Sequence, residues 1–464
     1  MLPLGGCLLS STSDPALDIP ALFREGPRSA KATQVALPPL DWWRKFRSRE
    51  LTGLIEQARA ANLDIAAAVA RIVQADAQAR IAGAPLLPDV ELNGSATRSR
   101  SSQTVGSGGT GGRSERNLYS ASLTASYEID FWGKNRSALR AAEQAAVASR
   151  YDREVVGLTT VVSVANAYFQ VLAAQDRLRV ARDNVASSTR ILDLIKQRLN
   201  AGTASALEVA QQESLVNTER AGIPPLEQSL QQNKATLALL IARPYESVNV
   251  RGGSLTSIAV PRVTPGLPSE LIAQRPDIRE AEAQLAAADA NVENARAQML
   301  PSITLTGEGG YQSAVLKTLL RPESAIYNVT AGLTQPIFDG LRLQGNLDLQ
   351  KGVQDELLQN YRKAVISGFT DVDKALVAVR QTNLTVRLQN DVVTSSRRAF
   401  DISEQRLREG TVDLVTVLQT QQTLFQAQDA LAQARLARLQ AIVSLYQALG
   451  GGWLPRPVEA KNAR

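Results

Sequence analysis

The sequence of 464 residues contains no histidine and only one cysteine, Cys7. Histidine is the commonest metal ligand and general base, so its absence removes most metal sites and most acid–base catalysis. One cysteine can form neither an internal disulfide nor, without histidine, a zinc site. No pair of carboxylates stands out from the charge pattern, and no nucleotide-binding loop is present. We therefore expect neither an enzyme nor a protein that holds a metal or cofactor.

Long apolar runs are absent as well. No window approaches the ~20 consecutive apolar residues of a membrane helix, so we expect no helical membrane protein. Short transmembrane strands stay possible, because they only alternate in polarity. Aromatic residues make up 5% of the chain, and alanine, glutamine, leucine and arginine dominate, which favours helices. The net charge of +6 comes from basic residues interleaved with acids, which indicates solvated helices rather than a nucleic-acid surface.

The N-terminus has a short lipidation motif. Leu4-Gly5-Gly6-Cys7 matches a bacterial lipobox, with an apolar residue and two small residues before the cysteine. In this interpretation Cys7 becomes the lipidated first residue of the mature protein. The segment lacks the basic region and the full apolar region of a signal peptide, so a chance cysteine is the alternative.

The chain contains an internal repeat of about two hundred residues. Residues 64–94 align with residues 277–307 without a gap, and 13 of the 31 positions are identical. Residues 197–203, QRLNAGT, recur at 405–411 as QRLREGT. A period this long is not that of a solenoid unit. It predicts two copies of one structural half.

Each half has two expected strands. The first half has them at about 88–98 and 118–130, separated by a loop rich in serine and glycine, and the second at about 301–312 and 325–337. In residues 118–127, serine and threonine alternate with apolar side chains. This pattern predicts strands with one wet and one dry face.

Long helices fill the rest of each half. We expect helices at 41–84 with a break near Asn62, at 134–200, and returning to 241 with a break at Pro224-Pro225. The second half repeats them at 269–298, 339–409 and returning to 449. Apolar residues spaced by seven indicate a coiled-coil seam: Leu178, Val185, Leu192 and Leu199 in the first half, and Val386, Val393, Phe400, Leu407 and Leu414 in the second.

The expected organisation follows from these elements. Residues 1–40 form the lipobox and an extended arm, 41–250 the first repeat, 251–268 a linker, 269–449 the second repeat and 450–464 a tail. The tips of the two long hairpins lie at Gly202 and Gly410. Glycine there permits a positive φ, and we expect Thr203 and Thr411 to cap the amides of the returning helices.

Several motifs together resemble one family. They are Leu4–Cys7, Ile129-Asp130-Phe131-Trp132-Gly133, Ile223-Pro224-Pro225-Leu226-Glu227, Arg275-Pro276-Asp277-Ile278, Leu300-Pro301, Gln335-Pro336-Ile337-Phe338-Asp339-Gly340 and the two Gly-Thr turns. From about Trp42 to Leu449 the chain resembles the outer membrane factors, the TolC-like efflux channels, and specifically their NodT-type lipoproteins.

The resemblance implies a mainly α fold with a small β part. Three chains would assemble into a periplasmic α-barrel, and four strands from each would make a 12-stranded barrel in the outer membrane of a Gram-negative bacterium. The function implied is a passive exit duct of a tripartite efflux system. The resistance-nodulation-division type is the preferred type of pump. Its partners would be a periplasmic adaptor protein, an inner-membrane pump and outer membrane lipid.

The resemblance also assigns roles to residues. The adaptor would dock at the hairpin tips, formed by Arg198, Leu199, Gly202, Thr203, Arg406, Leu407, Gly410 and Thr411. Relatives often carry aspartates six and nine residues beyond the second tip glycine, where this chain has Thr416 and Gln419. Glu208 and Asp413 are the nearest acids and could form the gate instead. The alternative is that these two acids only stabilise helix N-termini.

Other interpretations stay open. A duct for protein secretion by an ABC system is a second possibility within the same class. A coiled-coil scaffold outside any membrane is a possibility from another class, although the alternating strands oppose it. Near the strand ends, Phe131, Trp132, Tyr127 and Tyr311 are candidates for an interfacial aromatic girdle, and Phe131 could equally be core.

Overall fold

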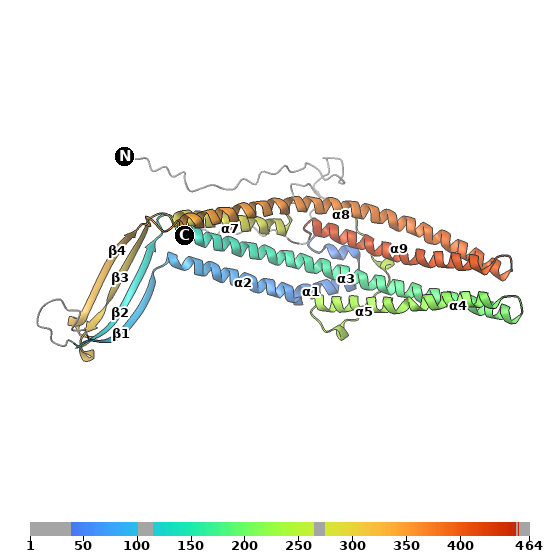
Figure 1. The fold of residues 1–464 in the computed structure, drawn as a ribbon, viewed down its shortest axis with the longest axis horizontal. Helices are drawn as coiled ribbons and strands as arrows, with labels where there is room; N and C mark the ends of the chain where they lie inside the picture. The colour runs from blue at the N-terminus through green and yellow to red at the C-terminus, as the bar shows by residue number, and fades with distance from the viewer. Residues whose placement is uncertain (1–38, 101–114, 264–273, 452, 454–464) are drawn as a thin grey trace. The chain divides into compact units, whose positions relative to one another are not determined.

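The structure is a computed structural model that describes residues 39–100, 115–263, 274–451 and 453. Helices dominate, and four strands lie between them in the sequence (Figure 1). The long elements are α1 (Arg49–Ala61), α2 (Leu63–Gly83), β1 (Asp89–Arg100), β2 (Glu115–Ile129), α3 (Lys134–Asn200), α4 (Ala206–Ala221), α5 (Ile223–Leu240), α7 (Pro276–Ala297), β3 (Ser302–Ser313), β4 (Ala325–Thr334), α8 (Arg342–Arg408) and α9 (Leu414–Ala448). Short 3-10 helices are η1 (Trp42–Phe46), η2 (Ala84–Leu86), η3 (Tyr245–Ser247), η4 (Leu255–Ser257), η5 (Leu316–Thr318) and η6 (Pro322–Ser324).

The chain divides into two compact units, and the first contains the sheet. This unit comprises residues 71–149 and 280–362 among those described. Its four strands pair antiparallel in the order β1-β2-β3-β4. Leu92 pairs with Leu123, Leu123 with Gly309, and Gly309 with Tyr327, so one row of paired residues crosses all four strands.

The register separates the side chains into two faces, because successive residues of a strand point to opposite sides. One face is mainly apolar and carries Val90, Leu92, Ala96, Leu123, Ile303, Leu305, Tyr327, Val329 and Leu333, with the charged Arg98, Arg100 and Glu115 only where β1 ends and β2 begins. The other carries Asn93, Ser95, Ser120, Ser122, Thr124, Thr304, Thr306, Glu308, Asn328 and Thr330. The expected wet and dry faces are thus confirmed. The apolar face lies open in the single chain, where Leu92 is 80% and Tyr327 88% exposed.

Both edges of the sheet are open as well. Among the described strands, β1 pairs only with β2, and β4 only with β3. In the central pairing, Gly310 allows β2 and β3 to approach closely, because a Cβ there would lie 2.3 Å from the carbonyl oxygen of Ala121. A strand edge with unpaired amides and carbonyls is a template for another strand.

The second unit packs helices around an aromatic core. It contains the described parts of residues 17–70, 150–279 and 363–464. Trp42 stacks on Tyr446 with ring centroids 4.6 Å apart, and Phe46 lies 5.3 Å from Phe169. The short helix η1 is an unpredicted 3-10 segment that brings Trp42 and Phe46, both fully buried, into this core.

Two helical hairpins form the rest of this unit. In the first, α3 turns at Gly202 into α4, and in the second α8 turns at Gly410 into α9. Near the turns, Ile191 and Ile195 of α3 pack with Leu407, Leu414 and further apolar residues of α8 and α9. Arg177 of α3 donates to Asp429 of α9 at 2.6 Å. The two hairpins therefore pack against each other through α3 of the first and both α8 and α9 of the second.

Several element boundaries differ from the expected ones. Of the expected helix at 269–298, the structure describes α7 from Pro276 to Ala297, and the expected start lies outside the described residues. The last strand ends at Thr334 rather than 337, because Pro336 has no N–H for the ladder. The break in the return helix falls at Gly222, and Pro224-Pro225 belong to the first turn of α5, where a missing N–H is harmless.

Two further expectations about the helices were wrong. Leu414 does not continue the seam of α8, since it lies beyond the turn and begins α9. One stretch of α3 is long and apolar enough to cross a membrane by length and composition, although no such window was expected. More than half of that stretch is buried within the protein, as expected for a helix that belongs to a packed core.

Candidate functional site

The two hairpin turns have the same backbone geometry. Gly202 and Gly410 both have φ +72°. In the first turn the N–H of Gly202 donates to Leu199 O at 2.9 Å, and in the second the N–H of Gly410 donates to Leu407 O at 3.1 Å. This left-handed conformation at the residue after a helix is the usual use of a C-terminal glycine. The sequence repeat at the tips is therefore a repeat of structure.

The tip threonines act on the helix that ends, not on the helix that begins. The N–H of Thr203 donates to Arg198 O at 2.8 Å, and its hydroxyl donates to the same oxygen at 3.1 Å. Thr411 makes the same pair of bonds to Arg406 O, at 2.9 and 3.2 Å. The expectation that these threonines cap amides is wrong, because they satisfy the orphan carbonyls of α3 and α8.

The amide caps come two residues later. Ser205 accepts from the N–H of Glu208, and the Glu208 carboxylate accepts from the N–H of Ser205 at 2.6 Å. This reciprocal pair is a capping box. At the second turn Asp413 caps α9 by accepting from the N–H of Thr416 at 3.0 Å. Serine and aspartate at these positions are favoured N-cap residues that sequence reasoning could have found.

The gate candidates all lie near these caps. Asp413 accepts from the Thr416 hydroxyl at 2.6 Å, and this bond, followed by the bond from the Thr416 amide, lowers the pKa of Asp413. Gln419 accepts through its backbone carbonyl from Thr423. Glu208 and Asp413 are thus used as helix caps, which supports the simpler of the two readings. A gating role for these four residues stays a prediction.

The two leucines of the tips differ in burial. Leu407 is 2% exposed inside the apolar cluster, whereas Leu199 is 36% exposed. The expectation that both close the seam is wrong for Leu199 in the single chain. The arginines differ in the same way. The Arg198 guanidinium donates to Leu407 O at 3.0 Å, whereas Arg406 is exposed.

Arg275 of the Arg-Pro-Asp-Ile motif joins three segments of the second unit. It donates to both carboxylate oxygens of Asp277, at 3.0 and 2.7 Å. It also donates to Asp371 of α8 at 3.3 Å and to the carbonyl of Ala448, at the end of α9, at 3.2 Å. Burial opposes its charge, but these carboxylates raise the pKa of Arg275. The motif was recognised from its sequence only as a family marker, and its packing role was missed.

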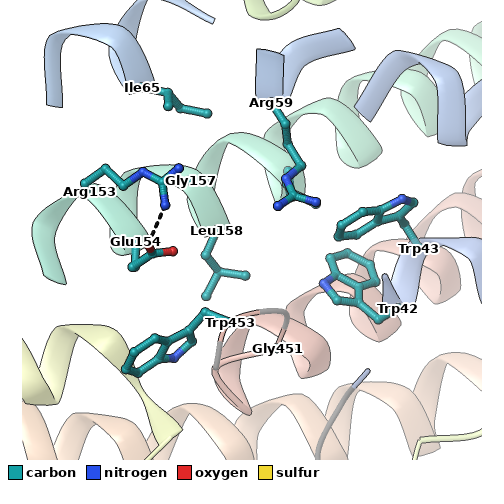
Figure 2. Close-up of a pocket in the computed structure, with 11 residues that line it drawn as sticks. Trp42, Trp43, Arg59, Ile65, Arg153, Glu154, Gly157, Leu158, Gly451 and Trp453 are labelled. Atoms are coloured by element: carbon teal, nitrogen blue, oxygen red, sulfur yellow. Dashed lines mark hydrogen bonds and ion pairs between the residues drawn. The ribbon is translucent and has the colours of Figure 1, made fainter. Parts of the chain in front are cut away.

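A small pocket lies beside the aromatic core (Figure 2). It is lined by Trp42 and Trp43 of η1, by Arg153 and Glu154 of α3, which form an ion pair, and by Trp453 among others. The Arg59 guanidinium lies 5.4 Å from the ring centroid of Trp43, a cation–π distance. Among the described residues, no group of three or more acidic side chains is placed so that it could hold a metal ion.

The aromatic candidates lie around the ends of the strands. Phe131 is 66% exposed, so the core reading of this residue is wrong for the single chain. Trp132 is partly buried, and its indole N–H donates to Pro301 O at 2.8 Å. Tyr311 is 37% exposed and Tyr127 is partly buried. Cys7, the lipidation candidate, lies outside the described residues.

Comparison with known proteins shows which family has this sequence and geometry. The model of the outer membrane efflux protein family matches residues 54–243 and 267–451. The chain is 42% identical to the pyoverdine export outer membrane protein OpmQ of Pseudomonas putida, over 98% of this chain and 97% of that protein. It is 32% identical to the toluene efflux pump outer membrane protein TtgF of Pseudomonas putida, over 99% and 97% of the two chains.

A solved structure agrees with the sequence relatives. The outer-membrane channel OprN matches with a TM-score of 0.89 at 25% identity, over 96% of this chain and all of that one. The internal repeat, the two-faced sheet and the paired hairpins are thus the features of a TolC-like channel. The chain belongs to the outer membrane efflux protein family.

Proposed function

We propose that three copies of this chain form the outer membrane exit duct of a tripartite efflux system. The observation that carries the proposal is the sheet, which has one apolar face, one polar face and two open edges. An open edge cannot remain in lipid, because its amides and carbonyls would have no partner. Pairing β4 of each chain with β1 of the next closes a ring of twelve strands.

The two faces of the sheet suit such a ring. The apolar face, with Leu92 and Val329, meets the lipid, and the polar face, with Ser122 and Thr306, lines a water-filled lumen. The 67 residues of α3 span ~100 Å at 1.5 Å per residue, a length that suits the periplasmic part of such a duct. Two similar hairpins per chain give six similar hairpins around the axis.

The hairpin tips are the proposed contact with the periplasmic adaptor. The matched geometry of the two turns supports this proposal. Repeated six times around the trimer, it would present the same kind of surface to the adaptor at each tip. The adaptor connects the duct to an inner-membrane pump. We propose that the pump selects the substrate, since the relatives are named for compounds as different as pyoverdine and toluene. These names favour small-molecule efflux over protein secretion.

The assembly can be tested by mass measurement of the purified protein in detergent. We expect a trimer that stays intact only with detergent or lipid. The variant Val329→Arg places a charge on the apolar face and should sharply reduce trimer in the outer membrane, since a lipid-facing arginine costs ~2–4 kcal/mol at the midplane. Its matched control is Asn328→Arg, on the opposite face of the same strand, which should leave the trimer yield near wild type. A protein that is monomeric in detergent while keeping its full helix content would contradict the proposal.

The lipobox gives a separate prediction. We propose that Cys7 is diacylated and N-acylated after cleavage before it. Because the strands also hold the trimer in the membrane, Cys7→Ser should alter delivery to the outer membrane more than retention there. Intact-mass analysis of the mature wild-type protein should show the added acyl chains. A free thiol on that protein would exclude lipidation and leave the duct proposal unaffected.

A further inference from the structure

The tip arginines Arg198 and Arg406 occupy equivalent repeat positions but make different contacts. Arg198 donates through Nη1 to Leu407 O at 3.0 Å and through Nη2 to Thr203 O at 3.4 Å. It thereby ties the first hairpin to the last turn of α8. Arg406 is exposed, and within the described part of the chain its guanidinium meets no acceptor. One turn therefore uses its arginine to bond to a carbonyl of the neighbouring hairpin, and the other does not. We call such an arginine–carbonyl bond between hairpins a strap.

The carbonyl groups show the complementary difference. Leu407 O accepts two donors, the N–H of Gly410 and the Arg198 guanidinium. Leu199 O, its repeat equivalent, accepts the N–H of Gly202 at 2.9 Å and no side chain among the described residues. A carbonyl oxygen has two lone pairs, so Leu199 O retains capacity for one more donor. Arg406 and Leu199 O are the repeat equivalents of Arg198 and Leu407 O, which bond to each other. In the second pair the donor and the acceptor each have room for a partner.

Burial shows the same asymmetry. Leu407 is 2% exposed because the first hairpin covers it, and Leu199 is 36% exposed because nothing described covers it. The backbones of the two turns match in φ and in all three pairs of backbone bonds. Only the neighbouring hairpin is missing on one side.

We propose that the Arg406 guanidinium donates to the Leu199 carbonyl of the next copy of this chain. The inference rests on the trimer proposed above, in which first and second hairpins alternate around the axis, so that the second hairpin of each chain lies beside the first hairpin of the next chain. Three straps then lie within chains and three between chains. The ring of six holds the tip closed, and opening the tip by moving whole chains apart breaks only the three Arg406 straps.

Conductance tests this role. Purified trimers are inserted into lipid bilayers without adaptor, and the conductance of wild type and Arg406→Met is recorded. We expect roughly a tenfold higher open probability for the variant, because three straps are lost at once and a tenfold change needs only ~1.4 kcal/mol. Arg406→Lys should restore part of the closure. The matched control is Arg408→Met, two residues away, because Arg408 is exposed and already pairs with Glu404 of its own helix.

Cross-linking tests the geometry independently. The double variant Leu199→Cys with Arg406→Cys, treated with a short bismaleimide, should link two chains covalently, whereas Leu199→Cys alone should not. Trimers that give no linked chains, or unchanged conductance in Arg406→Met, overturn the inference while leaving the duct intact. Unchanged conductance with weaker adaptor binding would assign Arg406 to an acidic group of the adaptor and equally overturn the strap. A monomeric wild type would overturn both the strap and the trimer.

Discussion

Replacing Arg275 by methionine is expected to destabilise the helical unit by ~2–3 kcal/mol. The side chain is 11% exposed and makes a bidentate pair with Asp277, bonds to Asp371 and a bond to Ala448 O. Breaking such a pair leaves its partners with unmatched polar groups. The effect is smaller than for a fully buried pair, because Asp277 and Asp371 are 38% and 41% exposed and can regain water.

The measurement is thermal unfolding of the purified protein in detergent, followed by circular dichroism. Arg275→Met should unfold at a clearly lower temperature than wild type. The control is Arg251→Met, because Arg251 is exposed and exposed substitutions usually change stability by no more than ~0.5 kcal/mol. An Arg275→Met protein that unfolds at the same temperature as wild type would show that the motif has no packing role.

Gly410→Val is expected to abolish efflux while the trimer survives. At φ +72° a β-branched residue strains the backbone by ~1–3 kcal/mol. No atom lies within 4 Å of the Cβ position, so the strain is local to the turn. The turn should change shape where the adaptor is proposed to dock, and the buried core of the hairpins should remain.

The measurement is drug susceptibility of a host that lacks its own duct, together with trimer yield in the outer membrane. Gly410→Asn is the matched control, because asparagine tolerates the left-handed region, and it should retain efflux. Gly202→Val tests the equivalent turn. Full efflux from both valine variants would show that the turns only connect helices.

The sequence was sufficient for the regular parts of the fold. The run without proline from Lys134 to Asn200 is one helix, with the predicted ends. The alternation in β2 fixed which face is apolar, and two repeated glycines located both tips. These features depend on local backbone preference and periodicity, which a single chain carries in its own residues.

Contacts between distant segments were less predictable. The repeat suggested that Leu199 and Leu407 are equally buried, but burial depends on which hairpin lies alongside, and the single chain supplies that neighbour for only one of them. Arg275 meets Asp371 across 96 residues, and no local pattern indicates such a pairing. Thr203 was misassigned because a hydroxyl after a helix can serve either the ending or the beginning helix.

The pairing of β2 with β3 has an evolutionary consequence. It joins the strand hairpin of one repeat to that of the other with 11 residue pairs, and in the trimer β4 and β1 would make the corresponding joint between chains. An ancestor built from six identical half-chains would have had six identical joints. Fusion of two halves divides them into three internal and three external joints that can diverge independently. Gly310 lies only in the internal joint, so adaptation there leaves the contact between chains unchanged.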